Sequence, residues 1–318
     1  MFSSCRHRGS KLGYRTTALE ALQGADLTGR TALVTGGNTG LGLETCRALA
    51  AGGAHVVLCS RSLEAGQAAA EQIRQEAKGR ISVCQLDLAD LRSIQALAAQ
   101  LASSGPSPDL LILNAGVMAL SPGPQRTADG FEMQFGVNHL GHFLLCQLLL
   151  PKMKAQGTPG RIVVVSSRIH ERGRIDLQDL NYKKRPYRPW ASYAQSKLAN
   201  VLFTRELARR LREEGSALEV YCLHPGIVQT NIGSHMGLQA RSFYLLFAPW
   251  LKTPEQGAAT TVYAATAAEL TGHSGAYLQD CRLSAPAKRA ESDALAAALW
   301  AKSAELVEGA LQRAALSL

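Results

Sequence analysis

The sequence predicts a single α/β domain in which a doubly wound parallel sheet lies between two layers of helices. Short apolar runs rich in Val, Leu and Ile alternate with longer amphipathic stretches along most of the 318 residues. No linker, internal repeat or low-complexity tract interrupts this alternation. Hydrophobic residues make up 46% and charged residues 19% of the chain, as expected of a globular protein with a large core. We therefore expect a three-layer α/β/α architecture.

Six runs have the composition of strands that are covered on both faces, because apolar residues occupy consecutive positions. They are TALVT (31–35), HVVLCS (55–60), ISVCQLD (81–87), LLILNA (110–115), RIVVVSS (161–167) and LEVYCLH (218–224). Helical periodicity fills the intervals at 41–52, 62–78, 90–104, 127–155 and 191–214. Strands separated by helices pair in parallel through right-handed crossovers, which place helices on both faces of the sheet.

The last part of the chain continues the same domain. TPEQGAATTVYAA (253–265) predicts a helix, GAYL (275–278) a short strand, and the Ala-rich end a closing helix. We therefore divide the chain into a flexible basic N-terminal arm (1–26), a main domain (27–285) and a C-terminal helical extension (286–318).

The net charge of +9 favours anionic ligands or a membrane surface, although a basic surface without a partner fits equally well. Basic residues are scattered among acids, so nucleic acid is not predicted as a partner. Seven scattered cysteines argue against a disulfide framework and for an intracellular reducing compartment. His139, His142, His170 and His224 have no Cys or carboxylate at ligand spacing, so we predict no metal site.

Residues 1–17 carry basic residues and no continuous apolar core, which excludes a secretory signal. A floppy basic arm is the simpler interpretation, and an organelle-targeting segment is the alternative. No apolar stretch reaches the roughly 20 residues that span a bilayer; the nearest is FYLLFAPWL (243–251). We expect a cytoplasmic protein, or one bound peripherally to an organelle membrane, chloroplast membranes included.

A glycine-rich loop, TGGNTGLG (35–42), follows the first predicted strand and precedes a helix. Its glycines let the backbone approach a phosphate, and the free N–H groups of the helix N-terminus favour an anion there. The spacing departs from G-x-G-x-x-G, and an ordinary glycine turn is the alternative. The loop residues expected to contact a dinucleotide are Gly36, Asn38, Thr39, Gly40, Leu41 and Gly42.

The second predicted strand ends in CSRS, where Arg61 lies 19 residues beyond Gly42 and no acid is present. In dinucleotide-binding folds an acidic residue near this position binds the ribose hydroxyls, whereas a basic one accommodates a 2′-phosphate. The sequence therefore favours NADP(H) over NAD(H), and a solvated surface arginine is the alternative. Further cofactor contacts are expected after the third and fourth strands, at the same sheet edge: Asp87, Leu88, Asn114, Ala115 and Gly116.

Tyr193 and Lys197 lie four residues apart in the helix predicted at 191–214, so their side chains share one helix face. A free phenol has a pKa near 10, and a nearby cation lowers that pKa because it favours the phenolate. These two side chains either take part in a reaction or only pack in the core.

Together these motifs resemble the short-chain dehydrogenases/reductases. TGGNTGLG, LDL, NAG, VNHLGHFLL, VVVSS, YAQSK and HPGIVQT occur in the order and approximate spacing of that family over residues 27–285. The resemblance implies a Rossmann-type fold and hydride transfer with a nicotinamide cofactor. The segments 16–30, 196–211 and 256–265 are similar to the group that holds retinol dehydrogenases, the WW-domain-containing oxidoreductase and the chloroplast translocon-associated dehydrogenase.

The resemblance implies catalytic roles for four residues. Tyr193 exchanges the proton of the substrate oxygen, and Lys197 lowers the pKa of Tyr193 and binds the nicotinamide ribose. Ser167 holds the substrate oxygen, and Asn138 holds a water that links Lys197 to solvent. Because Tyr193 lies 26 positions after Ser167, we expect the intervening polar segment to be a surface excursion that leaves the two together.

After the sixth predicted strand, the resemblance implies further cofactor contacts at Pro225, Gly226, Val228 and Thr230, the last at the nicotinamide carboxamide. Residues from about 226 to 252 are expected to form a substrate lid with apolar side chains. Ordinary core packing is the alternative for these side chains: Phe243, Tyr244, Leu245, Leu246, Phe247 and Trp250.

The predicted function is that of an NADP(H)-dependent oxidoreductase, which interconverts an apolar alcohol and its aldehyde or ketone. The expected substrate is retinoid-, isoprenoid- or lipid-like, and a homodimer and a peripheral membrane contact are compatible with the chain. An NADP(H)-sensing regulatory or interaction protein is the alternative. An enzyme similar to protochlorophyllide reductase ranks below both, because the longer insertion before the catalytic tyrosine is missing.

Overall fold

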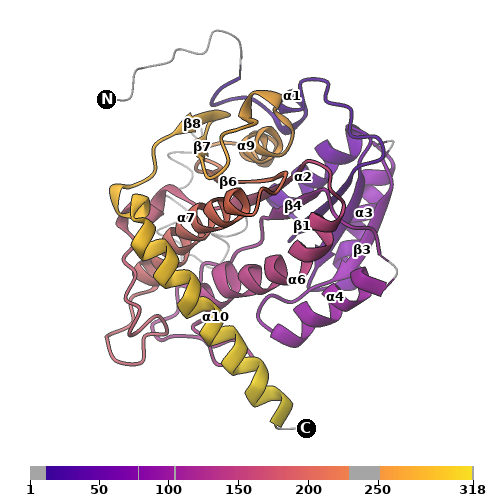
Figure 1. The fold of residues 1–318 in the computed structure, drawn as a ribbon. Coiled ribbons are helices and arrows are strands. Elements are labelled where there is room, and N and C mark those ends of the chain that lie inside the picture. Colours follow the sequence, from indigo (N-terminus) through magenta and orange to yellow (C-terminus); the bar gives the residue numbers. More distant parts are fainter. Residues whose placement is uncertain (1–11, 78, 104, 229–250, 317–318) are drawn as a thin grey trace.

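One sheet of eight strands runs through the computed structural model, which describes residues 12–77, 79–103, 105–228 and 251–316 (Figure 1). In chain order the strands are β1 (Thr31–Thr35), β2 (His55–Ser60), β3 (Ile81–Gln85), β4 (Leu110–Leu113), β5 (Gly160–Val165), β6 (Leu218–His224), β7 (Tyr277–Gln279) and β8 (Arg282–Ser284). Their order across the sheet is β3-β2-β1-β4-β5-β6-β7-β8. Neighbours from β3 to β7 pair in parallel, and β8 returns antiparallel to β7.

The winding direction of the chain reverses between β1 and β4, which are neighbours although two strands separate them in sequence. Such a switch point opens a crevice at the carboxyl ends of the strands, where ligands of open α/β sheets bind. The predicted doubly wound Rossmann-type sheet is therefore confirmed.

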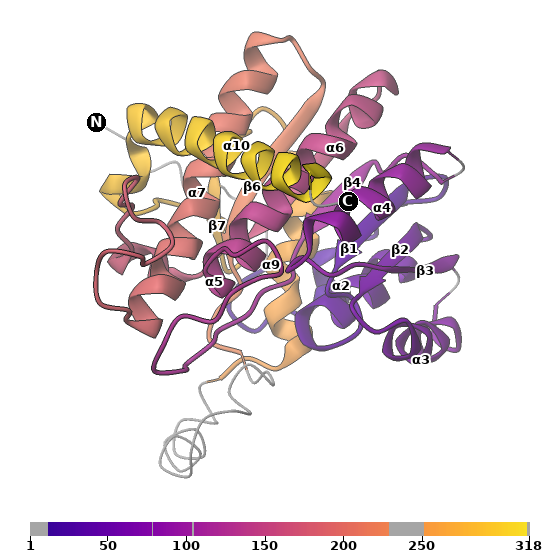
Figure 2. The ribbon, with the colours of Figure 1, turned by 90° about the horizontal axis from the view of Figure 1, so that it is seen from below.

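Helices cover both faces of the sheet, as Figures 1 and 2 show. One face carries α1 (Ala18–Ala21), α2 (Gly40–Ala51), α3 (Leu63–Arg74) and α9 (Pro254–Thr266). The other carries α4 (Leu91–Ser103), α6 (His142–Ala155), α7 (Pro189–Glu213) and α10 (Asp293–Leu316). Short helical turns complete the described chain: α5 (Met133–Phe135), the π-helix η1 (Gly136–Gly141), and the 3₁₀ turns η2 (Arg168–Arg172), η5 (Ala268–Leu270) and η6 (Lys288–Glu291).

Two hydrophobic cores lie on opposite sides of the sheet. Along β1, Leu33 belongs to the core under α4, α6 and α7, whereas Ala32 and Val34 belong to the core under α2 and α9. This alternation follows from the two-residue period of a strand, and it explains why the predicted strands are apolar at successive positions.

The helix predicted to begin at residue 127 begins later than expected. Thr127 N–H donates to Phe131 O at 2.9 Å in a tight turn, and the backbones of Arg126 and Glu132 pair in an isolated antiparallel β-bridge. Glu132 then caps α5, its carboxylate accepting from Phe135 N–H at 2.8 Å. The helical pattern therefore extended the predicted helix over a turn that precedes the observed one.

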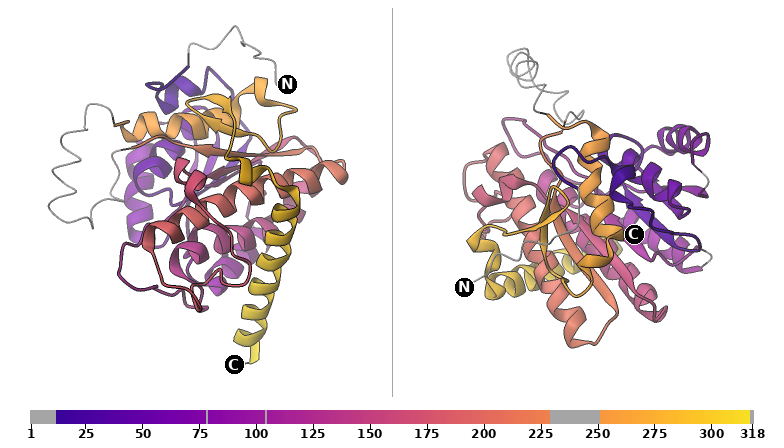
Figure 3. Two further views of the ribbon diagram at one scale, coloured as in Figure 1. Left: turned by 90° about the vertical axis from the view of Figure 1, so that its left-hand side faces the viewer. Right: turned by 90° about the horizontal axis from the view of Figure 1, so that it is seen from above.

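Two short elements were missed from the sequence, α1 and β8. The segment from Leu12 to Leu22, assigned to the N-terminal arm, contains α1, whose capping box joins Thr17 and Glu20 and whose apolar side packs on α9. The strand β8 follows a two-residue turn in which Asp280 and Cys281 both have positive φ, without the glycine that usually signals it. Figure 3 shows α10 crossing α7 with its last turns extending past the neighbouring helices.

Candidate active site

Most of the predicted cofactor-binding residues follow the carboxyl ends of parallel strands, on the loops after β1, β2, β3, β4 and β6. The loop after β1 leads into α2, and Thr39, the residue before this helix, makes no side-chain capping hydrogen bond. Gly36 has a φ of +65°. A Cβ on Gly42 would lie 2.0 Å from Gly36 O, so this position tolerates only glycine without movement of the loop. An uncapped helix N-terminus beside such a loop is suited to a phosphate.

The remaining loop residues are accessible to a ligand. Asn38, Gly40 and Leu41 are half-buried, and Thr39 is exposed. The predicted contacts of this loop therefore lie where a dinucleotide could reach them.

The end of β4 is fastened directly to this loop. Asn114 Nδ2 donates to Thr35 O at 2.9 Å, and the N–H groups of Asn114 and Ala115 both donate to Thr35 Oγ1, at 2.9 and 3.0 Å. A Cβ on Gly36 would meet Ala115 Cβ at 3.1 Å. The loops after β1 and β4, at the switch point, are therefore held together by direct hydrogen bonds.

Arg61, the residue predicted to select NADP(H), is exposed directly after β2. Its carbonyl oxygen accepts from Gln85 Nε2 at 3.1 Å, and Ser62 caps α3 through Ala65 N–H. The backbone around Arg61 is thus fixed while its guanidinium faces solvent.

After β3, the Asp87 carboxylate accepts from Ala89 N–H at 2.9 Å, which shapes a turn. Leu88 is buried and packs against η1, since a Cβ on Gly141 would lie 2.6 Å from Leu88 O. Leu88 therefore lies under the segment that carries Asn138.

Lys197 is buried on α7, one turn after Tyr193. Its Nζ donates to Val165 O, at the end of β5, over 3.1 Å, and lies 5.6 Å from the centre of the Tyr193 ring. The adjacent Ser166 Oγ donates to Lys197 O at 2.7 Å, which ties this helical turn to the strand. A Cβ on Gly116 would be 3.3 Å from Lys197 Nζ, so the ammonium borders the loop after β4.

Burial changes both pKa values of this pair. Loss of hydration lowers the pKa of Lys197 to about 8 and raises the pKa of Tyr193 to about 12. In the chain without ligands, desolvation of the phenol is the dominant effect on the pKa of Tyr193. The expected lowering of this pKa by Lys197 together with an oxidised nicotinamide stays a prediction. The ammonium points to a carbonyl oxygen of β5 and does not offset that burial.

Asn138 lies in the π-helix η1, completely buried. Its Oδ1 accepts from Val117 N–H at 2.8 Å, and its Nδ2 donates to Val117 O and to Ser196 Oγ, both at 3.0 Å. The carboxamide thus joins the loop after β4 to α7, one residue before Lys197. Single π-helical turns within α-helices frequently mark functional positions.

Ser167 follows β5 and caps η2, its Oγ accepting from Ile169 N–H at 3.3 Å. The turn η2 packs on α7: a Cβ on Gly173 would lie 2.4 Å from the carbonyl oxygen of Ala194, which follows Tyr193. Ser167 and Tyr193 therefore lie on two elements that are in direct contact.

The polar segment between them is anchored as well as exposed. The buried Asp179 carboxylate accepts from the N–H groups of Lys183, Lys184 and Arg185 at 2.6, 3.1 and 3.0 Å. Arg185 in turn donates to Gln195 Oε1 at 2.5 Å. The expected surface excursion is therefore clamped to the first turns of α7.

After β6, Pro225 is buried and Gly226 has a φ of +97°. Val228 pairs with Lys252 in an isolated parallel bridge, and Lys252 Nζ forms an ion pair with Asp280 at 2.5 Å. The predicted contact Thr230 and the apolar lid side chains named above lie outside the described residues.

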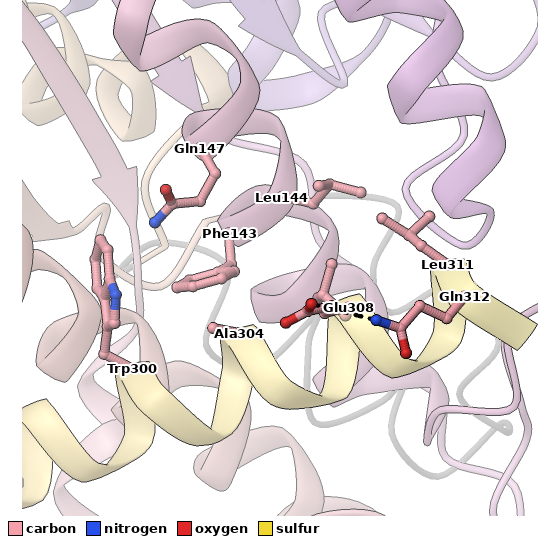
Figure 4. Close-up of a pocket in the computed structure, with 9 residues that line it drawn as sticks. Phe143, Leu144, Gln147, Trp300, Ala304, Glu308, Leu311 and Gln312 are labelled. Carbon is pink, nitrogen blue, oxygen red and sulfur yellow. Dashed lines mark hydrogen bonds between the residues drawn. The ribbon is translucent and has the colours of Figure 1, made fainter.

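A shallow groove of about 470 Å³ lies elsewhere, between α6 and α10 (Figure 4). Trp300 and Phe143 line one end, and Glu308 accepts a hydrogen bond from Gln312 at the other. None of the predicted site residues lines this groove.

Sequence reasoning missed three residues that hold the site together: Thr35, Val117 and Ser196. Thr35 and Ser196 lie within the quoted motifs TGGNTGLG and YAQSK, whereas Val117 had no signal. Among the described residues no group of three His, Cys, Asp or Glu side chains is placed to hold a metal ion. No helix in the described part of the chain is long and apolar enough to cross a membrane.

Known proteins share both the sequence and the fold. Retinol dehydrogenase 13 of Homo sapiens is 46% identical over 289 residues, which cover 89% of this chain and 86% of that protein. Retinol dehydrogenase 14 of Mus musculus is 44% identical over 286 residues, covering 86% and 84%.

Solved structures agree. An uncharacterised protein from Mycobacterium paratuberculosis has a TM-score of 0.74 at 39% identity, covering 91% of this chain and 97% of that one. A protein described as an NAD(P)-dependent gluconate 5-dehydrogenase from Beutenbergia cavernae, with bound NADP, has a TM-score of 0.64 at 29% identity, covering 80% and 95%. The family model of the short chain dehydrogenases matches residues 30–240. The switch-point loops, the Tyr193–Lys197 helix and these comparisons together establish that the chain belongs to the short-chain dehydrogenase family.

Proposed function

We propose that this protein is an NADP(H)-dependent oxidoreductase that interconverts an apolar alcohol and its aldehyde or ketone. One observation carries the proposal: a buried ammonium, Lys197 Nζ, is held by Val165 O at the carboxyl end of β5, one helical turn from Tyr193. A buried cation beside a phenol, at the edge where dinucleotides bind, is suited to proton exchange with a substrate oxygen.

The loop residues fit a dinucleotide. The uncapped start of α2 leaves N–H donors free for a phosphate, and Gly42 lets this helix turn pack closely on the backbone of the loop. We propose that the contacts are those predicted after β1, β2, β3, β4 and β6. When bound, the nicotinamide would donate or accept the hydride.

Three side chains would handle the substrate oxygen. The raised pKa of Tyr193 keeps its phenol protonated at neutral pH, which is the form that donates a proton to a carbonyl oxygen during reduction. In the oxidative direction Lys197, whose pKa of about 8 leaves it mostly cationic at pH 7, would favour the phenolate. Ser167, half-exposed on the neighbouring turn, would orient the oxygen. Asn138 would keep the loop after β4 in contact with α7.

Arg61 supports the preference for NADP(H), because it is exposed at the tip of β2 where a 2′-phosphate would lie and no carboxylate accompanies it. The gluconate 5-dehydrogenase from Beutenbergia cavernae holds NADP, whereas a 7α-hydroxysteroid dehydrogenase at 27% identity and a TM-score of 0.64, covering 80% of this chain and 93% of that one, holds NADH. The argument for NADP(H) therefore depends on Arg61.

The retinol dehydrogenases among the relatives support an apolar alcohol as substrate, of retinoid, isoprenoid or lipid type. The six described free thiols are all buried, which suits the reducing compartment that we propose.

The test is NADPH oxidation by the full chain with retinal and a series of long-chain aldehydes. Tyr193→Phe should lower the rate by at least about 100-fold, the usual effect of losing a general acid, with NADPH affinity retained. Tyr263→Phe, a buried tyrosine of α9 in the opposite core, is the matched control and should keep wild-type activity. Equal and near-zero rates for wild type and Tyr193→Phe, together with tight NADPH binding, would instead favour a cofactor-sensing protein.

A further inference from the structure

His142 is a buried imidazole between two parts of the proposed cofactor site. It is the first residue of α6 and is 2% exposed. Its Nδ1 lies 3.2 Å from Asn138 O, and its Nε2 lies 2.9 Å from Thr35 Oγ1. One ring therefore touches both the π-helical turn of Asn138 and the last residue of β1.

The partners of the Thr35 hydroxyl decide which atom donates in its hydrogen bond with His142. A hydroxyl oxygen has two lone pairs, and those of Thr35 Oγ1 already accept the N–H groups of Asn114 and Ala115. The hydroxyl must therefore act as the donor toward a third partner. His142 Nε2 at 2.9 Å is closer than Ile112 O at 3.4 Å, so the Thr35 hydroxyl donates to Nε2.

This assignment decides the tautomer of the ring. Because Nε2 accepts, the single proton of neutral imidazole is on Nδ1, which donates to Asn138 O. Burial and the nearby Lys197 cation lower the pKa of His142 to about 3, so the ring is neutral at physiological pH. Every polar atom in this network then has a partner.

We propose that neutral His142, with its proton on Nδ1, is a positioning residue that holds the glycine-rich loop and the Asn138 turn in register and thereby sets the affinity for NADP(H). The network runs from Asn138 O through His142 to Thr35 Oγ1, and from there to the amides of Asn114 and Ala115. The effect on affinity rests on the proposed function, whereas the tautomer does not.

The chain contains its own control. His139, in the same turn, is equally buried and has a pKa lowered to about 3 by that burial. Its Nε2 bonds Ser303 of α10 at 2.9 Å, and its ring packs among Phe135, Phe143 and Phe203. Removal of either imidazole disturbs the core, but only His142 reaches the loops of the proposed cofactor site.

The experiment compares His142→Leu with His139→Leu in the full chain, by NADPH titration, steady-state kinetics and thermal unfolding. Both variants should unfold at lower temperature. His142→Leu should bind NADPH about tenfold more weakly, equivalent to about 1.4 kcal/mol, whereas His139→Leu should stay within about twofold of wild type. His142→Gln, whose side-chain oxygen can accept from Thr35, should recover part of the affinity.

A measurement on the wild-type protein does not depend on these variants folding or on the cofactor. The ¹⁵N chemical shifts of the His142 ring should identify Nδ1 as the protonated nitrogen. Protonation on Nε2, or equal NADPH affinity of the two leucine variants, would overturn the inference. Failure of the wild type to bind NADPH would instead count against the proposed function and against the effect of His142 on affinity. The ¹⁵N measurement would still test the tautomer.

Discussion

The carbonyl oxygen of Gly36 lies so close to the Cα of Gly42 that a Cβ on residue 42 would be 2.0 Å from it. The same Cβ would be 2.7 Å from Asn114 Nδ2, which is itself bonded to Thr35 O. Gly42 is not among the glycines with positive φ. The first turn of α2 therefore requires glycine for close packing on the loop, and its backbone conformation alone would accept other residues.

Gly42→Ala should lower the free energy of unfolding by about 1–3 kcal/mol, the usual cost of overpacking, and should weaken NADPH binding because the loop must move. Urea unfolding and NADPH titration measure the two effects. Gly123→Ala is the control, because a Cβ there would meet no atom within 4 Å and its φ is not positive. If both alanine variants match wild type, the close packing of the loop does not matter for binding.

Lys197→Met should make the protein more stable while it abolishes activity. Burial lowers the pKa of Lys197 from its ordinary 10.5 to about 8, which at about 1.4 kcal/mol per tenfold change in proton affinity is on the order of 3 kcal/mol. Loss of the bond to Val165 O offsets about 1 kcal/mol, and Asn200 Nδ2, at 3.3 Å, still donates to that oxygen. A site that trades stability for activity is expected to respond in this way.

The pH dependence checks the sign of this effect. Between pH 8 and 10.5 the unfolded chain binds more protons at Lys197 than the folded chain, so wild-type stability rises with pH in that window. The advantage of Lys197→Met should be full near pH 7 and should shrink as the pH approaches 10.5. Urea unfolding at several pH values measures it, and a variant that is less stable than wild type at pH 7 would contradict the prediction.

The strands and the site segments could be predicted because they are local patterns. The run predicted at 110–115 begins with apolar residues at successive positions, so both faces of the expected strand are apolar. The structure places β4 at Leu110–Leu113. Contacts outside regular helical and strand spacing decided what was missed. Arg126 and Glu132 pair across the turn between them, and α5 begins only after it. No local pattern could reveal that His142 meets Thr35, which is 107 residues away.

The pKa of Tyr193 illustrates the same limit within the site. Helical spacing correctly placed Tyr193 and Lys197 on one side of a helix, where Nζ lies 5.6 Å from the ring centre. It could not tell that Val165 O holds the ammonium or that burial raises the pKa of the phenol. Sequence spacing thus predicts proximity, whereas the electrostatic result depends on desolvation that only the packed structure defines.

Arg61→Ala should weaken NADPH binding about tenfold or more, equivalent to about 1.4 kcal/mol, with little change for NADH. The expected reason is the loss of a charge-assisted contact to the 2′-phosphate, which NADH lacks. Titration with both cofactors measures the ratio. Arg212→Ala, an exposed arginine in the last turn of α7, serves as the control. An unchanged ratio of the two affinities would remove the argument for NADP(H).

Asp179→Asn should loosen the segment between η2 and α7. The carboxylate accepts hydrogen bonds from three backbone N–H groups and pairs with Arg185. Burial raises the pKa of Asp179, but these hydrogen bonds outweigh it and lower the pKa. Loss of the charge should cost about 1.5–3 kcal/mol, the range for hydrogen bonds to charged groups. Because the pKa is lowered in the folded state, this stabilisation is present above the ordinary value of 3.8 and disappears as the pH falls through the folded pKa.

Trypsin offers a local measurement of the same change. Lys183 and Lys184 are exposed, but their N–H groups are held by Asp179. Cleavage after these lysines should therefore be faster in Asp179→Asn than in wild type. Asp176→Asn is the control, because the Asp176 carboxylate accepts from a single N–H group in the described part of the chain, that of Gln178 at 3.1 Å. If both variants are cleaved at the wild-type rate, Asp179 does not clamp the segment, and the first turns of α7 around Tyr193 must be held by Gln195 and its bond to Leu180 O.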